Sequence, residues 1–472
     1  MGTRPFTILV LLAALSAPAE VIRLKNGRTI WADHVRENKN RIEYDVGEDT
    51  YAIPKSLVER IDAGGIAPQH TSLGNGGSAE IPDFTPTEPT FNHEADISEK
   101  IVRDGKVDAD ALAHFEQQGN AEVAATAYFL AGKHESDHGN FPLAKRYFES
   151  ALRFQPENST LLIYYAACLL RTGHAAEALP YAERAARAAP DSADAVAMLG
   201  FVQFATDDTQ SAIRSFKKSL KLRPDSTVRQ YLARAERESK AESDFSQRES
   251  SHFNLHFEGK QTSESFRRDL LATLDSQYDD LVRDLGYSPH NTIAVTLYTE
   301  QVFFDVTQAP SWSGAVNDGK LRIPVSGVTS VTLDLARVLK HELTHSFVNL
   351  MSGGRCPTWL NEGIAQAEEG KSSASYGRQL AQLFGAGREI PYNGLEGGFM
   401  RFSAPEAVVA YAESLVAVEY IRDTYGMSEI PRILERLAQG SSTEAALRAT
   451  IHADYAQLHD DLARWLKDRY GQ

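Results

Sequence analysis

Cysteine is scarce in this sequence: only Cys168 and Cys356 occur in 472 residues. Cys168 lies in an apolar stretch with helical character, and Cys356 lies far downstream, in what we interpret as a different domain. This spacing argues against a disulfide framework, even in an oxidising compartment. We expect both side chains to be packed thiols.

Long hydrophobic runs are also missing, and no segment is apolar for long enough to cross a bilayer as a helix. The N-terminus has a shorter pattern, with Arg4, an apolar core over 6–15, and the small residues Ala17-Pro18-Ala19. This order is typical of a secretory signal. We therefore expect residues 1–19 to be removed and the mature chain, from Glu20, to be exported to a periplasmic or extracellular location. An uncleaved anchor is the alternative.

Basic residues are outnumbered, with 49 Lys and Arg against 64 Asp and Glu, which gives a net charge of −15. This balance argues against nucleic acid or an anionic membrane as the main partner. A hydrophobic content of 42% with 24% charged residues is ordinary for soluble globular protein. The length predicts a multidomain chain of roughly two to four domains.

The first predicted domain, residues 20–64, is a small β module. Short alternating runs at 21–24, 29–32 and 41–44 predict strands separated by turns. The module has little core and no catalytic constellation, so we expect a docking or structural role. Residues 65–120 follow as a linker and pre-repeat segment, whose first part is dense in Gly, Pro, Ser and Thr.

Residues 121–242 repeat with a period of 34, marked by Pro156, Pro190 and Pro224. Small residues share this register at three further positions: Gly132, Ala166 and Gly200; Ala144, Ala178 and Ala212; and Ala151, Ala185 and Ser219. This pattern resembles tetratricopeptide repeats. The resemblance implies an all-α stack of three helix pairs whose groove binds a protein or peptide partner. A rigid spacer is the alternative.

The most informative motif is His341-Glu342-Leu343-Thr344-His345. Apolar residues around it recur at helical spacing, and no Pro or Gly interrupts 331–352. Two His four residues apart lie on one face of a helix. Both imidazoles can therefore bind one Zn²⁺, with Glu342 placed to act as a general base on water.

A zinc site of this kind needs a third protein ligand. Downstream, Trp359-Leu360-Asn361-Glu362-Gly363 follows Pro357, which suits the first turn of a helix. The two motifs, in this order, resemble those of the gluzincin metallopeptidases. The resemblance implies that His341, His345 and Glu362 hold zinc and that Glu342 activates water. Glu368 and Glu369 are rival ligands, which we expect to be more exposed.

The gluzincin resemblance covers residues 251–472 and implies a C-terminal α+β peptidase domain. Alternating and helical runs predict strands at 253–257 and 292–298, a helix at 262–285 and a hairpin around 317–319. Gluzincins commonly stabilise the oxyanion with a Tyr or His from a later helix. Tyr411, which we expect near the start of such a helix, is the first candidate, and Tyr392 is the second.

Three further features bear on function. The similar motif of His134 and His138 has a charged inner residue and no downstream partner motif, so we interpret it as polar surface. Asn317 replaces the Glu that holds the substrate amino terminus in aminopeptidase gluzincins, which favours an endopeptidase. The alternative function is a secreted repeat scaffold with a structural or vestigial zinc domain, although an intact Glu342 favours an enzyme.

Overall fold

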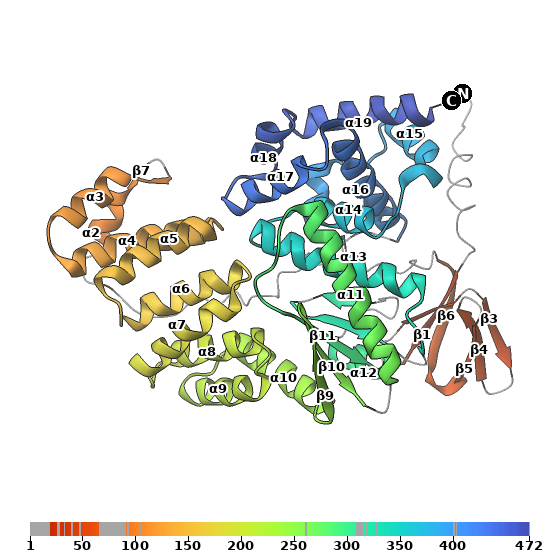
Figure 1. The fold of residues 1–472 in the computed structure, drawn as a ribbon, viewed down its shortest axis with the longest axis horizontal. Helices are drawn as coiled ribbons and strands as arrows, with labels where there is room; N and C mark the ends of the chain where they lie inside the picture. The colour runs from red at the N-terminus through yellow and green to blue at the C-terminus, as the bar shows by residue number, and fades with distance from the viewer. Residues whose placement is uncertain are drawn as a thin grey trace.

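The computed structural model describes residues 19–25, 29–32, 34–38, 41–46, 49–65, 91, 94–103, 105–259, 262–307, 315–317, 319–325, 328–399, 402 and 404–471. A β module, an arc of helices and a larger C-terminal part of helices and a sheet follow one another along the chain (Figure 1). The multidomain prediction is therefore confirmed. Except for Ala19, the expected signal segment lies outside the described residues. Within them, no helix combines the length and hydropathy needed to cross a membrane.

The β module consists of two three-stranded antiparallel sheets, with strand orders β2-β1-β6 and β3-β4-β5. Ile22 and Ile42 are buried within it. The expected strands are confirmed, and the module has additional ones. Its strands are β1 (Ala19–Leu24), β2 (Thr29–Ala32), β3 (His34–Asn38), β4 (Arg41–Val46), β5 (Asp49–Pro54) and β6 (Val58–Gly65).

The arc begins before the repeats, with two helices that pack on the first repeat and a short hairpin between them. Three helix pairs and a closing helix follow. The bounds are α2 (Glu94–Ile101), β7 (Val102–Arg103), β8 (Lys106–Val107), α3 (Ala109–Gln117), α4 (Ala121–Asp137), α5 (Phe141–Phe154), α6 (Ser159–Arg171), α7 (Ala175–Ala188), α8 (Ala193–Ala205), α9 (Thr209–Leu222) and α10 (Ser226–Ala241).

The repeat register has a direct steric cause. A Cβ on Gly132 would lie 2.6 Å from the Phe148 ring, and a Cβ on Gly200 would lie 2.7 Å from the Phe216 ring. Both rings are fully buried. The paired helices therefore approach closely only because these positions lack a side chain, which is the reason for the 34-residue pattern of small residues.

The C-terminal part has a five-stranded mixed sheet of order β12-β13-β11-β10-β9, in which β10, β11 and β13 are parallel. Alternate residues of the central strands, such as Leu255, Val295 and Ile323, enter the main core with α11 and α13. The bounds are β9 (Phe245–Glu249), β10 (Phe253–Glu258), α11 (Glu264–Leu285), β11 (Ile293–Tyr298), α12 (Glu300–Thr307), β12 (Val316–Asn317) and β13 (Leu321–Pro324).

The other face of the sheet lies against α12 and the last repeat helix, α10. The sequence predicted no strand between the repeats and the strand at 253–257, but β9 forms there. Only three residues separate α10 from β9, whose residues 245–249 pair with β10. Alternation in this short polar strand was too weak to predict it.

Helices make up the rest of the domain. The metal helix α13, which carries the predicted His ligands, joins α14 through Gly353 and Gly354, whose positive φ angles permit a tight reversal of the chain. The bounds are α13 (Leu333–Ser352), α14 (Thr358–Glu368), α15 (Gly377–Gly385), α16 (Ala404–Tyr425), α17 (Glu429–Ala438), α18 (Thr443–Thr450) and α19 (Tyr455–Tyr470).

Candidate metal centre

Helix α13 carries both His residues on its buried face. Its N-terminus is capped by the Thr332 hydroxyl, which accepts a hydrogen bond from the backbone N–H of Leu335, and its C-terminus ends at Gly353. His341 and His345 are 5% and 1% exposed, and their rings lie 4.8 Å apart. The spacing of four thus places the two imidazoles together, as predicted.

Helix α14 brings the third candidate ligand, Glu362, which is fully buried. The next residue, Gly363, lies against α16: a Cβ there would be 2.3 Å from the Ser414 carbonyl oxygen. Only glycine permits this approach of the two backbones. The Asn-Glu-Gly run therefore combines a ligand with the small residue that lets its helix pack.

The three side chains form a compact cluster. Glu362 Oε2 lies 3.6 Å from His341 Nε2, and Glu362 Oε1 lies 3.8 Å from His345 Nε2. One ligand atom from each residue lies within 4.8 Å of the other two. Ligand atoms around a tetrahedral zinc ion lie about 3.3 Å apart, given zinc–ligand bonds of about 2.0–2.1 Å. The two distances from Glu362 to the imidazoles exceed this value by only a few tenths of an ångström, and the widest separation in the cluster would have to close by up to about 1.5 Å.

Each imidazole is oriented by a hydrogen bond from its other nitrogen. His345 Nδ1 lies 2.9 Å from Asn361 Oδ1, and His341 Nδ1 lies 3.2 Å from Glu369 Oε1. Because amide and carboxylate oxygens accept, each Nδ1 donates. The Nε2 atoms are thereby left to face Glu362, which is the arrangement that surrounds metal-binding His in proteins.

The electrostatics of the cluster favour a cation. Burial works to lower the pKa of His341, but the carboxylates of Glu362 and Glu369 outweigh it and raise this pKa to about 10. In His345, burial prevails and lowers the pKa. Both Glu362 oxygens and His341 Nε2 are buried without a hydrogen bond. Buried polar atoms are normally satisfied, and a divalent cation would satisfy these.

The two candidate tyrosines lie in different surroundings. Burial raises the pKa of Tyr411 well above its usual value, and the charges of Glu362 and Glu342 raise it further, which shows that Tyr411 is near the cluster. Tyr392 instead donates to the Glu413 backbone oxygen over 2.9 Å. Tyr411 lies inside α16, which begins at Ala404, so our expectation that it opens the helix was wrong.

The rival ligands are placed differently from our expectation. Glu369 contacts His341 through Nδ1, and Glu368 lies 3.2 Å from Lys340 Nζ. The side chains of both Glu are only 6–7% exposed, so the expected solvent exposure was wrong. The reason is that α14 packs against α13, and both carboxylates contact side chains of that helix. Glu369, two turns beyond Glu362, therefore still faces the metal helix.

The remaining sequence features keep their predicted character. His134 and His138 lie at the surface, where their rings contact each other and each forms a hydrogen bond with a backbone oxygen. Among the described residues, His341, His345 and Glu362 are the only group of three or more metal-binding side chains whose ligand atoms lie close together. Both cysteines are free thiols, and burial raises the pKa of Cys168 to about 12.

Comparison with known protein families places this geometry in context. Residues 276–468 match the family model described as the Peptidase MA superfamily, and residues 129–193 and 169–227 match a tetratricopeptide repeat model. The chain carries tetratricopeptide repeats followed by a Peptidase MA superfamily domain. The arrangement expected from the sequence is thereby confirmed. A search of curated proteins finds no match.

Solved structures of MamA share limited similarity with this chain. The form of MamA from residue 41 to its end, from Desulfovibrio magneticus RS-1, is 19% identical and covers 36% of this chain and 88% of its own, with a TM-score of 0.27. The MamA RS-1 ArsTM double mutant is 20% identical and covers 35% and 85%, with a TM-score of 0.26.

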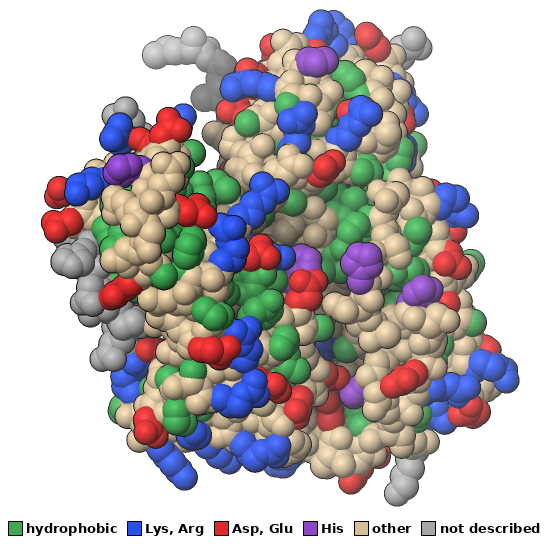
Figure 2. All heavy atoms as spheres, turned by 60° about the vertical axis from the view of Figure 1, so that its left-hand side comes forward, with side chains coloured by type: hydrophobic (Ala, Val, Ile, Leu, Met, Phe, Trp, Pro, Cys, Tyr) green, Lys and Arg blue, Asp and Glu red, His purple; other side chains and the backbone are tan. Residues whose placement is uncertain are grey.

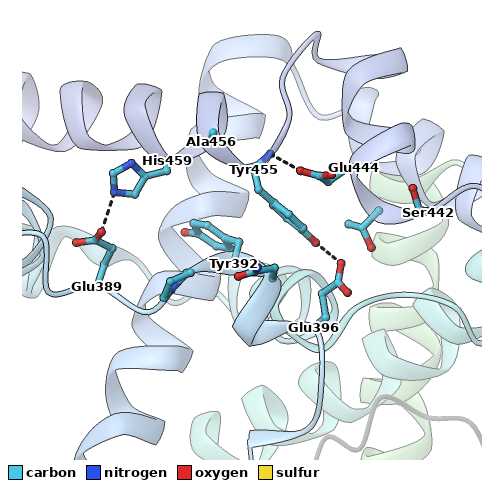
Figure 3. Close-up of a pocket in the computed structure, with 11 residues that line it drawn as sticks. Glu389, Tyr392, Glu396, Ser442, Glu444, Tyr455, Ala456 and His459 are labelled. Atoms are coloured by element: carbon cyan, nitrogen blue, oxygen red, sulfur yellow. Dashed lines mark hydrogen bonds and ion pairs between the residues drawn. The ribbon is translucent and has the colours of Figure 1, made fainter.

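The Peptidase MA superfamily domain also has a surface pocket of about 640 Å³ between residues 389–396, the start of α18 and the start of α19 (Figure 3). Its ionisable groups are largely paired with one another: His459 contacts Glu389 over 2.9 Å, and the Tyr455 hydroxyl donates to Glu396 over 2.6 Å. The pocket shares no residue with the metal cluster. We therefore place the candidate site at the cluster.

Sequence reasoning missed the residues that support the ligands. Asn361 directly precedes Glu362 in the Trp-Leu-Asn-Glu-Gly motif, so the motif could have indicated its role. Gln366, one turn after Glu362, donates to the Tyr411 backbone oxygen over 2.9 Å and ties α14 to α16. Nothing in its local sequence signals this contact, because the partner lies 45 residues away.

Proposed function

We propose that this chain is an exported zinc-dependent endopeptidase whose repeats bind a protein or peptide partner. The observation that carries the proposal is the buried cluster of His341, His345 and Glu362. It lies in a Peptidase MA superfamily domain, with Glu342 on the same helix. Two His and one Glu are a ligand set typical of catalytic zinc sites.

When bound, zinc would polarise a substrate carbonyl and lower the pKa of a water molecule. The chain would supply the remaining functions. Glu342, fully buried on α13, would accept the proton of the attacking water and pass it to the leaving amine. A tyrosine is protonated at neutral pH, and the raised pKa of Tyr411 extends this to more alkaline pH, so its hydroxyl would donate to the developing oxyanion.

The outer strand β12 offers a way to hold an extended substrate. It is the last strand in the sheet order, and among the described residues it pairs only with β13. An edge strand presents unpaired backbone groups to which a peptide can add as a further strand. Such backbone recognition suits internal segments of a polypeptide.

Asn317 supports endopeptidase over aminopeptidase activity. Its Nδ2 donates to the Glu342 backbone oxygen and to Ser346 Oγ, each over 2.7 Å, and the residue is 4% exposed. This side chain joins β12 to the metal helix. It is therefore not positioned to bind the amino terminus of a substrate.

The alternative is a secreted repeat scaffold with a structural zinc site. A structural site needs no general base and has four protein ligands as a rule. The fully buried Glu342 beside a three-residue ligand set favours the enzyme. Export rests on the N-terminal pattern alone, and N-terminal sequencing of the native protein tests it, with Glu20 as the expected first residue.

A peptide-library digest with purified full chain tests the enzyme proposal. We expect cleavage within peptides, loss of cleavage after treatment with a chelator, and recovery when zinc is added. The Glu342→Gln protein is the matched control for a contaminating protease. Cleavage that persists in this variant, or no cleavage with one zinc bound per chain, would favour the scaffold.

A further inference from the structure

The repeat stack meets the Peptidase MA superfamily domain through a row of equivalent turns. In each helix pair, the turn between the two helices has one residue with positive φ: Gly139 at 73°, Gly173 at 80° and Asp207 at 69°. These residues are 34 apart and so occupy one register position. We call them the turn ridge. Consecutive repeats therefore place equivalent inter-helix turns on one side of the stack.

Two members of the turn ridge contact the end of the metal helix. Arg355, just after α13, donates to the Gly139 backbone oxygen, and its other terminal nitrogen donates to Gly440 over 3.4 Å. A Cβ on Gly173 would lie 2.9 Å from Leu350 Cδ2, in the last turn of α13. The C-terminal end of α13 is thus held between the repeats and its own domain.

The third member breaks the glycine pattern. A non-glycine residue at positive φ is strained, and Asp207 and His452 are the cases among the described residues. Strained positions tend to be kept where their side chain has a role. Here the Asp207 carboxylate contacts Nζ of Lys320, the residue just before β13, and lies 3.2 Å from His256 Nε2 on β10.

A buried charge network continues from this contact. Glu238 of α10 is fully buried and accepts from Arg322 Nη2 over 2.9 Å and from Lys320 Nζ over 3.5 Å. Lys320 and Arg322 are only 6% and 1% exposed. A buried charge that loses its partner is strongly unfavourable. Lys320 and Arg322 therefore depend on Glu238 of α10 as their charge partner, and Glu238 depends on them.

We propose that the repeat stack is permanently docked on the peptidase domain through the turn ridge, where it braces the C-terminal half of the metal helix. This role goes beyond the partner binding of the proposed function, because the stack is then part of the peptidase fold. A partner held by the stack stays at a fixed place relative to the metal centre. Figure 2 shows the two parts in contact, with a recess between them.

Asp207→Gly in the full chain gives the sharpest test. On backbone grounds alone, glycine at φ 69° relieves strain and should stabilise the protein. The proposal predicts the opposite result: amide hydrogen exchange at β13 and in the last turn of α13 should accelerate roughly tenfold or more, the order expected from losing charge-assisted hydrogen bonds. Asp207→Asn, which tolerates the same φ, should accelerate exchange as well.

Glu236→Gln is the matched control, because Glu236 lies on α10 but pairs with Lys217 at the surface. It should leave exchange unchanged. Arg355→Gln is an independent variant at the other end of the turn ridge, and it should accelerate exchange in the last turn of α13. Faster exchange in the last turn of α13, both in Asp207→Gly and in Arg355→Gln, supports the proposal that the repeat stack braces this helix. Unchanged α13 exchange in Asp207→Gly and Arg355→Gln, or a Glu236→Gln effect of the same size, would overturn it.

Discussion

Replacing Gly363 by alanine would drive a methyl group into α16. The new Cβ would lie 2.3 Å from the Ser414 carbonyl oxygen and 2.6 Å from Val418 Cγ2. The Val418 side chain can rotate away, but a backbone carbonyl in a helix cannot. Real Cβ atoms essentially never lie within 3.0 Å of another atom, so α14 and α16 must separate by at least the missing 0.7 Å.

This separation has a thermodynamic and a functional consequence. Overpacking a buried contact costs about 1–3 kcal/mol. For a domain of this size, each kcal/mol lowers the melting temperature by about 2–4 °C. Glu362 precedes Gly363 on α14, so the metal ligand moves as well. We therefore expect Gly363→Ala to melt several degrees lower in calorimetry and to bind zinc more weakly in titration.

Gly385→Ala is the control, because Gly385 ends α15 and a Cβ there would meet nothing within 4 Å. This variant should be neutral or slightly stabilising, since alanine favours helix over glycine by up to about 1 kcal/mol. Equal melting temperatures for Gly363→Ala and wild type, with equal zinc affinity, would refute the packing argument.

Three further predictions concern the side chains around the cluster. Glu342→Gln should keep zinc but lower the rate of hydrolysis by about 10²–10⁴-fold, because the amide cannot accept the water proton. Glu369→Ala and Asn361→Ala should each weaken zinc binding by roughly 10–100-fold, since each removes the acceptor that orients a His ligand. Tyr411→Phe should lower kcat with little change in KM, whereas Tyr392→Phe should affect stability and leave kcat near wild type.

Each of these predictions has an outcome that contradicts it. Full hydrolysis by a folded Glu342→Gln protein removes that residue from the mechanism. Zinc affinities equal to wild type in Glu369→Ala and Asn361→Ala would show that the Nδ1 contacts do not support the ligands. A kcat loss in Tyr392→Phe without one in Tyr411→Phe would reverse the assignment of the oxyanion donor.

Local sequence patterns were sufficient to predict much of the fold. Helix α13, the repeats and the strands at 253–257 and 292–298 each follow from a period that is repeated several times within a short segment. The position of Glu362 followed from a resemblance between motifs. Spacing alone did not distinguish it from Glu369, which lies two turns further on the same helix.

Contacts between distant segments could not be predicted in this way. The hydrogen bond between His345 and Asn361, and the docking of Asp207 on Lys320, depend on how helices and the sheet pack in three dimensions. Asp207 is an example of a hidden signal. The repeat register shows that it replaces a glycine, but only the fold shows that its carboxylate meets a buried lysine.

The central claim is that Glu362 completes a metal site with the two His residues of α13. The most direct test is a zinc titration of wild type and of the folded variants Glu362→Ala, Glu368→Ala and Glu369→Ala. We predict one tight zinc site in wild type, its loss in Glu362→Ala, a weakened site in Glu369→Ala and wild-type binding in Glu368→Ala. Wild-type affinity in Glu362→Ala, with loss of the site in Glu369→Ala or Glu368→Ala, would contradict the account.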